Sequence, residues 1–73
     1  MRYIVNKTDR FDKWLKKLKN IRAKVMIAKR IERLKDGYFG DYKSLGDELF
    51  ELRIFTGAGY RIYFTQKEKE LII

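Results

Sequence analysis

The chain has 73 residues, of which 45% are hydrophobic and 15% aromatic, enough for one small packed domain and unlike a disordered chain. It contains neither cysteine nor histidine. This composition excludes disulfides, thiolate metal sites and nucleophiles activated by histidine. The net charge of +8 favours a polyanionic partner such as RNA, DNA or an acidic protein, although a basic, soluble surface would give the same charge.

The N-terminal stretch MRYIVNKTDRF predicts a short strand, because Tyr3 and Val5 alternate with Ile4. It has no apolar region of the kind found in secretory signals. No apolar run along the chain approaches the roughly 18 residues that span a membrane. We therefore expect a cytoplasmic protein.

A first helix is predicted to begin after Thr8 or Asp9, either of which can cap its N-terminus. Its apolar residues recur at helical spacing and predict one buried face, made by Phe11, Trp14, Leu15 and Leu18. We therefore expect Trp14 in the core. The lysines of this helix point away from that face and include Lys13, Lys16 and Lys17.

A second helix is predicted from about Ile21 to Asp36, after a break at Asn20. Its apolar stripe runs through Ile21, Val25, Ala28, Ile31 and Leu34, with Ala23, Ile27 and Arg30 beside it. Gly37 follows the last turn and fits the position where a helix ends with positive φ.

The short break between the two helices predicts an antiparallel helical hairpin. Residues 1–37 carry 13 Lys and Arg against 4 Asp and Glu, a net charge of +9, whereas residues 38–73 carry 5 against 6, a net charge of −1. The basic charge of the chain is therefore expected on the exposed sides of this hairpin.

The segment GYFGDYKSLGDE, residues 37–48, is predicted to be a loop lying against the body of the domain. Strands are predicted at about 49–55, at about 60–65 and from Glu70 onward. Gly57 or Gly59 can supply the positive φ of the turn at residues 56–59. These elements predict a single α+β domain over residues 1–73, with an antiparallel sheet of three to four strands.

One register of the strands 49–55 and 60–65 brings their apolar residues to one face, because side chains alternate between faces along a strand. It pairs Ile54 with Tyr60, Leu52 with Ile62, and Phe50 with Phe64. On the other face it places Arg53 opposite Arg61, and Glu51 opposite Tyr63. Facing like charges destabilise a sheet, so either Glu51 or the anion of a ligand must compensate them. Both a solvated face and an anion site fit this pattern.

These four residues have the chemistry to cleave RNA without histidine. Glu51 can take the proton of a ribose 2′-OH, and Arg53 and Arg61 can stabilise the phosphorane that forms. Tyr63 can protonate the leaving 5′-oxygen or serve as a stacking platform for a base.

Four motifs occur in order along nearly the whole chain: the helix FDKWLKKLKN, the loop GYFGDYK, the strand ELR and the hairpin GAGYRIYF. Through them the chain closely resembles the RelE/HigB superfamily of toxins, and best its branch of addiction-module killer proteins. The resemblance implies a RelE-like fold with a strand, two helices and an antiparallel sheet. It also implies a type II toxin, a ribosome-dependent mRNA endonuclease that inhibits translation and is held in check by an antitoxin of helix-turn-helix type. It implies no cofactor and no metal.

The resemblance implies roles for particular residues. Arg61, in the GYR motif, is the most recurrent basic residue of the family, and Arg53 occupies a second basic position. Glu51 stands where some members have a carboxylate base, and Lys43 is an expected RNA contact. The basic helical hairpin adds Lys13, Lys16 and Lys17 as expected RNA-binding residues.

The sequence departs from the family at its C-terminus. Family members continue the last strand into a glycine-rich segment and a final helix, whereas this sequence ends at Leu71-Ile72-Ile73. We therefore expect these elements, and the catalytic groups on them, to be missing. This departure leaves two alternatives open: a non-catalytic domain of the same fold that binds RNA or an antitoxin, and a gyrase inhibitor of the ParE kind. The arginines of the ELR and GYR motifs favour RNA cleavage over gyrase inhibition.

Overall fold

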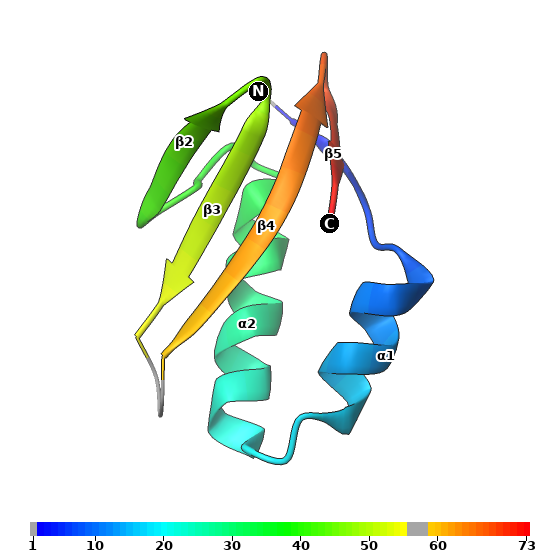
Figure 1. The fold of residues 1–73 in the computed structure, drawn as a ribbon, viewed down its shortest axis with the longest axis vertical. Helices are drawn as coiled ribbons and strands as arrows, with labels where there is room; N and C mark the ends of the chain where they lie inside the picture. Colours follow the sequence, from blue (N-terminus) through cyan, green and yellow to red (C-terminus); the bar gives the residue numbers. More distant parts are fainter. Residues whose placement is uncertain (1, 56–58) are drawn as a thin grey trace.

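The computed structural model describes residues 2–55 and 59–73 and confirms the α+β class (Figure 1). Along the chain the elements are β1 (Ile4–Asn6), α1 (Asp9–Lys17), α2 (Ile21–Leu34), β2 (Tyr42–Gly46), β3 (Leu49–Ile54), β4 (Tyr60–Lys67) and β5 (Glu70–Ile72). Within the described residues the strands form one sheet in the order β1-β5-β4-β3-β2. The hairpin turn expected at 56–59 lies outside these residues, except for Gly59, whose φ is +84°.

The sheet has five strands and is mixed, so the prediction of three to four antiparallel strands was wrong in number and order. The N-terminal strand β1 pairs in parallel with β5, with Val5 opposite Leu71. The segment expected to be a loop contains β2, which pairs antiparallel with β3. The strand was not predicted because its glycine and polar residues are typical of a loop. Its pairing is also irregular, with a bulge between Ser44 and Gly46.

Side-chain caps set where the helices begin. The Thr8 hydroxyl accepts a 3.2 Å hydrogen bond from the backbone N–H of Phe11, which confirms Thr8 as the N-cap of α1. The side-chain oxygen of Asn20 accepts a hydrogen bond from the backbone N–H of Ala23 and caps the N-terminus of α2. The break between the two helices therefore lies at Asn20, as predicted. Helix α2 ends at Leu34, two residues before the predicted boundary, and Gly37 adopts φ +85° as expected.

The hydrophobic core lies between the helices and one face of the sheet. Helix α2 lies behind β3 and β4, and α1 runs beside it in the opposite direction, as predicted (Figure 1). The buried residues of α2 are Ala23, Ile27, Ile31 and Leu34. The last three form one core cluster with strand residues Leu52, Ile54, Ile62, Phe64 and Leu71. The α1 residues Phe11, Leu15 and Leu18 pack against the edge of this core.

Two expectations about the helices were wrong. The buried stripe of α2 is shifted from the predicted one, since Ile21 is 74% exposed and Val25 is 47% exposed. Ala23 and Ile27, which were expected beside the stripe, are buried instead, whereas Ile31 and Leu34 of the predicted stripe are buried as expected. Trp14 is 39% exposed rather than part of the core. Among the described residues, no helix has the length and apolar character needed to cross a bilayer.

Candidate nucleic-acid interface

The register predicted for β3 and β4 is confirmed. Ile54 pairs with Tyr60, Leu52 with Ile62, Phe50 with Phe64, Arg53 with Arg61, and Glu51 with Tyr63. Since Leu52 and Ile62 are buried under the helices, the alternate residues lie on the opposite face of the sheet. That face therefore presents a polar cluster, defined as Glu51, Arg53, Arg61 and Tyr63.

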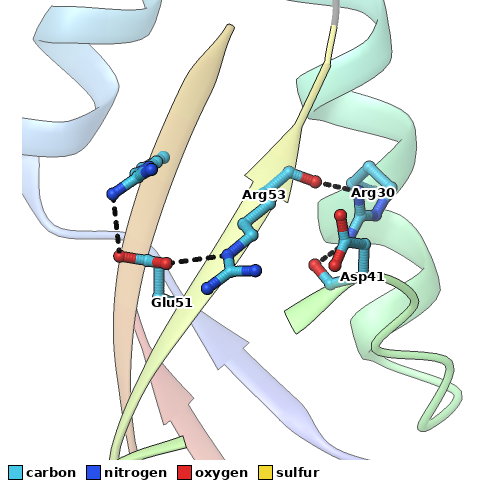
Figure 2. A network of polar contacts seen from close by, with 5 residues as sticks. Arg30, Asp41, Glu51 and Arg53 are labelled. Carbon is cyan, nitrogen blue, oxygen red and sulfur yellow. Dashed lines mark hydrogen bonds and ion pairs between the residues drawn. The ribbon is translucent and has the colours of Figure 1, made fainter. Parts of the chain in front are cut away.

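Glu51 is the centre of the polar cluster (Figure 2). Its Oε1 accepts a 3.0 Å hydrogen bond from Nε of Arg53, and its Oε2 lies 3.9 Å from a terminal nitrogen of Arg61. Glu51 is only 5% exposed, whereas the side chains of Arg53 and Arg61 are 34% and 68% exposed. The facing arginines are thus compensated by Glu51, the first of the two possibilities that the sequence left open.

The environment of Glu51 lowers the pKa of its carboxyl. The hydrogen bond from Arg53 is the main cause, and Tyr63 and the charge of Arg61 lower the pKa further, although burial opposes them. Glu51 is therefore a carboxylate at neutral pH. In the free protein its lowered pKa also makes it a weaker base than an ordinary glutamate.

Arg53 is fixed from the side of the core by Arg30, which comes from α2. The guanidinium of Arg30 donates a 2.7 Å hydrogen bond to the backbone carbonyl of Arg53 and a 2.9 Å bond to the backbone carbonyl of Asp41 (Figure 2). It also donates a 2.9 Å hydrogen bond to the carbonyl of Phe39. Gly40 makes room for this arrangement, since a Cβ there would lie 3.1 Å from a guanidinium nitrogen of Arg30.

Sequence reasoning did not assign Arg30 a role. The available signal was its position beside the apolar stripe of α2, because an arginine that faces a core needs carbonyl or carboxylate partners. Arg30 joins α2, the loop before β2 and the strand that carries Arg53. Through its hydrogen bond to the carbonyl of Arg53, it holds the backbone beneath the polar cluster.

Lys43 lies on β2 directly opposite Glu51, on a strand rather than in the expected loop. Cross-strand partners share a face of the sheet, so Lys43 extends the row of Glu51 and Tyr63. Lys43 is exposed, and Tyr63 is 49% exposed. Around Glu51, the open face of the sheet therefore combines the basic side chains of Lys43, Arg53 and Arg61 with the exposed Tyr63.

The remaining expected RNA-binding residues, Lys13, Lys16 and Lys17, are exposed on α1. Among the described residues, no hydrogen bond or ion pair joins their side chains to the polar cluster. These lysines form a separate basic surface on the helix. Within residues 2–55 and 59–73, no group of three or more acidic side chains is arranged to hold a metal ion.

Comparisons with known proteins add one relative. A protein of Haemophilus influenzae named "Uncharacterized protein" is 56% identical over 63 residues. The match covers 86% of this chain and 64% of that protein, so the chain spans less than two-thirds of its relative's length. No protein-family model and no solved structure matches the chain.

Proposed function

We propose that this chain is the toxin of a type II toxin–antitoxin system, an endoribonuclease that cleaves mRNA on the ribosome and so inhibits translation in the cytoplasm. The observation that carries the proposal is the facing pair Arg53 and Arg61, held by Glu51 on a sheet face that the helices leave open. The ordered motifs shared with the RelE/HigB toxins support it. A helix-turn-helix antitoxin is the expected partner that holds the toxin inactive.

In the proposed reaction, the ribose 2′-oxygen forms a bond to the adjacent phosphorus while the bond from phosphorus to the 5′-oxygen breaks. Glu51 accepts the proton of the 2′-OH, and the hydroxyl of Tyr63 donates a proton to the leaving 5′-oxygen. The products are a cyclic phosphate and a free 5′-OH. Arg53 and Arg61 stabilise the charge of the phosphorane, because guanidinium groups bind phosphate oxygens in a bidentate manner.

Substrate binding strengthens Glu51 as a base. Arg61 lies 3.9 Å from the carboxylate and is 68% exposed, so its guanidinium is free to turn toward a phosphate. Once it does so, Glu51 loses one of the positive partners that lower its pKa and gains a negative neighbour. Both changes raise the pKa of Glu51 toward the range in which a carboxylate accepts protons efficiently.

The test is induction of the chain in cells, followed by mapping of the 5′ ends of cellular mRNA. Cleavage on the ribosome predicts cuts that keep a fixed phase with the codons. These cuts should disappear in Arg61→Ala and persist in Lys69→Ala, which removes an exposed positive charge from the β4–β5 turn. Cuts of equal strength in Arg61→Ala would contradict the assignment.

A second candidate function is a non-catalytic domain that binds RNA or an antitoxin. The observation that favours it is the lowered pKa of Glu51, which suits a structural counter-ion better than a base. Antitoxin binding without growth arrest or mRNA cuts would support this candidate. Growth arrest with DNA damage and without mRNA cuts would instead point to a gyrase inhibitor.

A further inference from the structure

A hollow of about 460 Å³ lies beside the polar cluster, between the N-terminal half of α1 and strand β4. Its volume falls in the range of roughly 300–1,000 Å³ typical of small-ligand sites. Helix α1 contributes Arg10 and Trp14 to its lining, and β4 contributes Arg61 and Tyr63. The hollow therefore continues the polar cluster onto the first helix.

Trp14 is held in a defined position although it is 39% exposed. Its ring meets the ring of Tyr60 at an angle of 70° with the centroids 6.3 Å apart, and the ring of Phe11 at 5.7 Å. Aromatic pairs of this geometry orient a side chain. Trp14 belongs to the apolar face of α1, yet part of its ring is exposed in the hollow and is available to a ligand.

Single exposed apolar side chains are common on protein surfaces, so exposure alone does not indicate that Trp14 binds a ligand. The side chains that line the hollow with Trp14 indicate which ligand would fit. Two arginines and a tyrosine line the same hollow. An apolar peptide would use the aromatic walls and leave Arg10 and Arg61 without partners. A nucleotide uses both, because its base stacks on aromatic rings and its phosphates pair with arginines.

We propose that this hollow binds one unpaired nucleobase of single-stranded RNA, with Trp14 as the stacking platform and Arg10 as the partner of a neighbouring phosphate. The inference rests on the proposed function, since it places the base next to the phosphate that Arg61 holds. It assigns Trp14 and Arg10, which the family motifs leave without a role, as residues that set substrate preference. Double-stranded RNA is a poor ligand for the hollow because its bases remain stacked on one another.

Trp14 is the single tryptophan of the chain, so intrinsic fluorescence reports on the hollow directly. A short single-stranded RNA should quench this fluorescence on binding. An abasic RNA of the same length should bind through its phosphates without the same quenching. Trp14→Ala should weaken binding of the normal RNA roughly 5- to 150-fold, the range expected for loss of one stacked base, and Trp14→Phe should retain most of the affinity.

Tyr38→Ala is the matched control, because Tyr38 is 70% exposed and does not line the hollow. Circular dichroism of each variant separates loss of binding from loss of fold. Equal quenching by abasic RNA, or unchanged RNA affinity in folded Trp14→Ala, would overturn the inference. The absence of any RNA binding by the unaltered chain would overturn it as well.

The two proposals fail in different ways. If mRNA cuts are absent in cells but base-dependent quenching and the Trp14→Ala effect are present, the cleavage proposal fails and the base site stands. If cuts are present and Trp14→Ala changes neither RNA affinity nor the bases at the cut sites, the base site fails and the cleavage proposal stands. A changed base preference at the cut sites in Trp14→Ala would support both.

Discussion

The carboxylate of Glu51 accepts a 3.0 Å hydrogen bond from the Nε of Arg53, two residues further along β3. Residues two apart on a strand share a face, so this contact lies within one strand and needs no ligand. Together with the approach of Arg61 from β4, it offsets the repulsion of two facing arginines. The contacts of the polar cluster therefore form without a ligand.

The lowered pKa of Glu51 predicts a pH-dependent contribution to stability. Because the carboxyl has a lower pKa in the folded protein than its ordinary value of 4.5, the ionised form stabilises the fold. This contribution is complete above about pH 4.5 and is lost as the pH falls through the folded-state pKa. Urea unfolding of the unaltered chain and of Glu51→Gln should differ at neutral pH and converge in acid. A difference that persists unchanged in acid would contradict the linkage.

Glu51→Gln should also separate RNA binding from RNA cleavage. Removing the carboxylate leaves both arginines available to phosphate, so the affinity for RNA should hold or increase at low salt. Cleavage should fall by a factor of about 10²–10⁴, the usual contribution of a general base. Filter binding and single-turnover cleavage on ribosomes measure the two effects. Parallel losses of affinity and cleavage would assign Glu51 a structural role alone.

The sequence was sufficient to predict how β3 and β4 pair, and therefore which residues of the polar cluster face one another. A single register buries Leu52 and Ile62 together, and that register places Arg53 opposite Arg61, as the structure confirms. The helix caps at Thr8 and Asn20 were predictable for a similar reason, since a local hydrogen bond decides them.

Long-range pairing was not predictable in the same way. The parallel pairing of β1 with β5 joins residues at opposite ends of the chain, and no local pattern encodes it. The strand β2 was concealed because Gly46 and a bulge interrupt its alternation. Trp14 has the spacing of a core residue, but α1 packs at the edge of the sheet and leaves part of its ring exposed.

Gly40→Ala should destabilise the fold by displacing Arg30. The backbone of Gly40 has φ +67°, and an added Cβ would lie 3.1–3.3 Å from the guanidinium group of Arg30. The left-handed conformation alone costs roughly 1–2 kcal/mol for a residue other than glycine. Gly46→Ala is the matched control, since Gly46 has φ +89° and nothing within 4 Å of the added Cβ. Thermal or urea unfolding should show a greater loss for Gly40→Ala, and equal losses would mean that Arg30 moves aside without cost.

Arg30→Met should weaken both stability and cleavage. It removes three hydrogen bonds to backbone carbonyls, among them that of Arg53. Hydrogen bonds from charged groups contribute about 1.5–3 kcal/mol each, although such contributions do not simply add. Cleavage should fall at temperatures where the variant is still folded, because the backbone that carries Arg53 is less fixed. Arg33→Met, an exposed residue of the same helix, should leave both properties unchanged.

The lysines of α1 should contribute to RNA binding without contributing to chemistry. Lys13, Lys16 and Lys17 are exposed, and among the described residues no hydrogen bond or ion pair joins their side chains to the polar cluster. On single strands each neutralised phosphate adds about 0.7 to the slope of log affinity against log salt, so the triple alanine variant should have a slope smaller by about 2. Its single-turnover cleavage rate at saturating RNA should be unchanged. Replacing Lys69 of the β4–β5 turn by alanine is the control for a general loss of positive charge. If the α1 variant and the control both had the salt slope of the unaltered chain, α1 would be excluded as a surface that binds RNA.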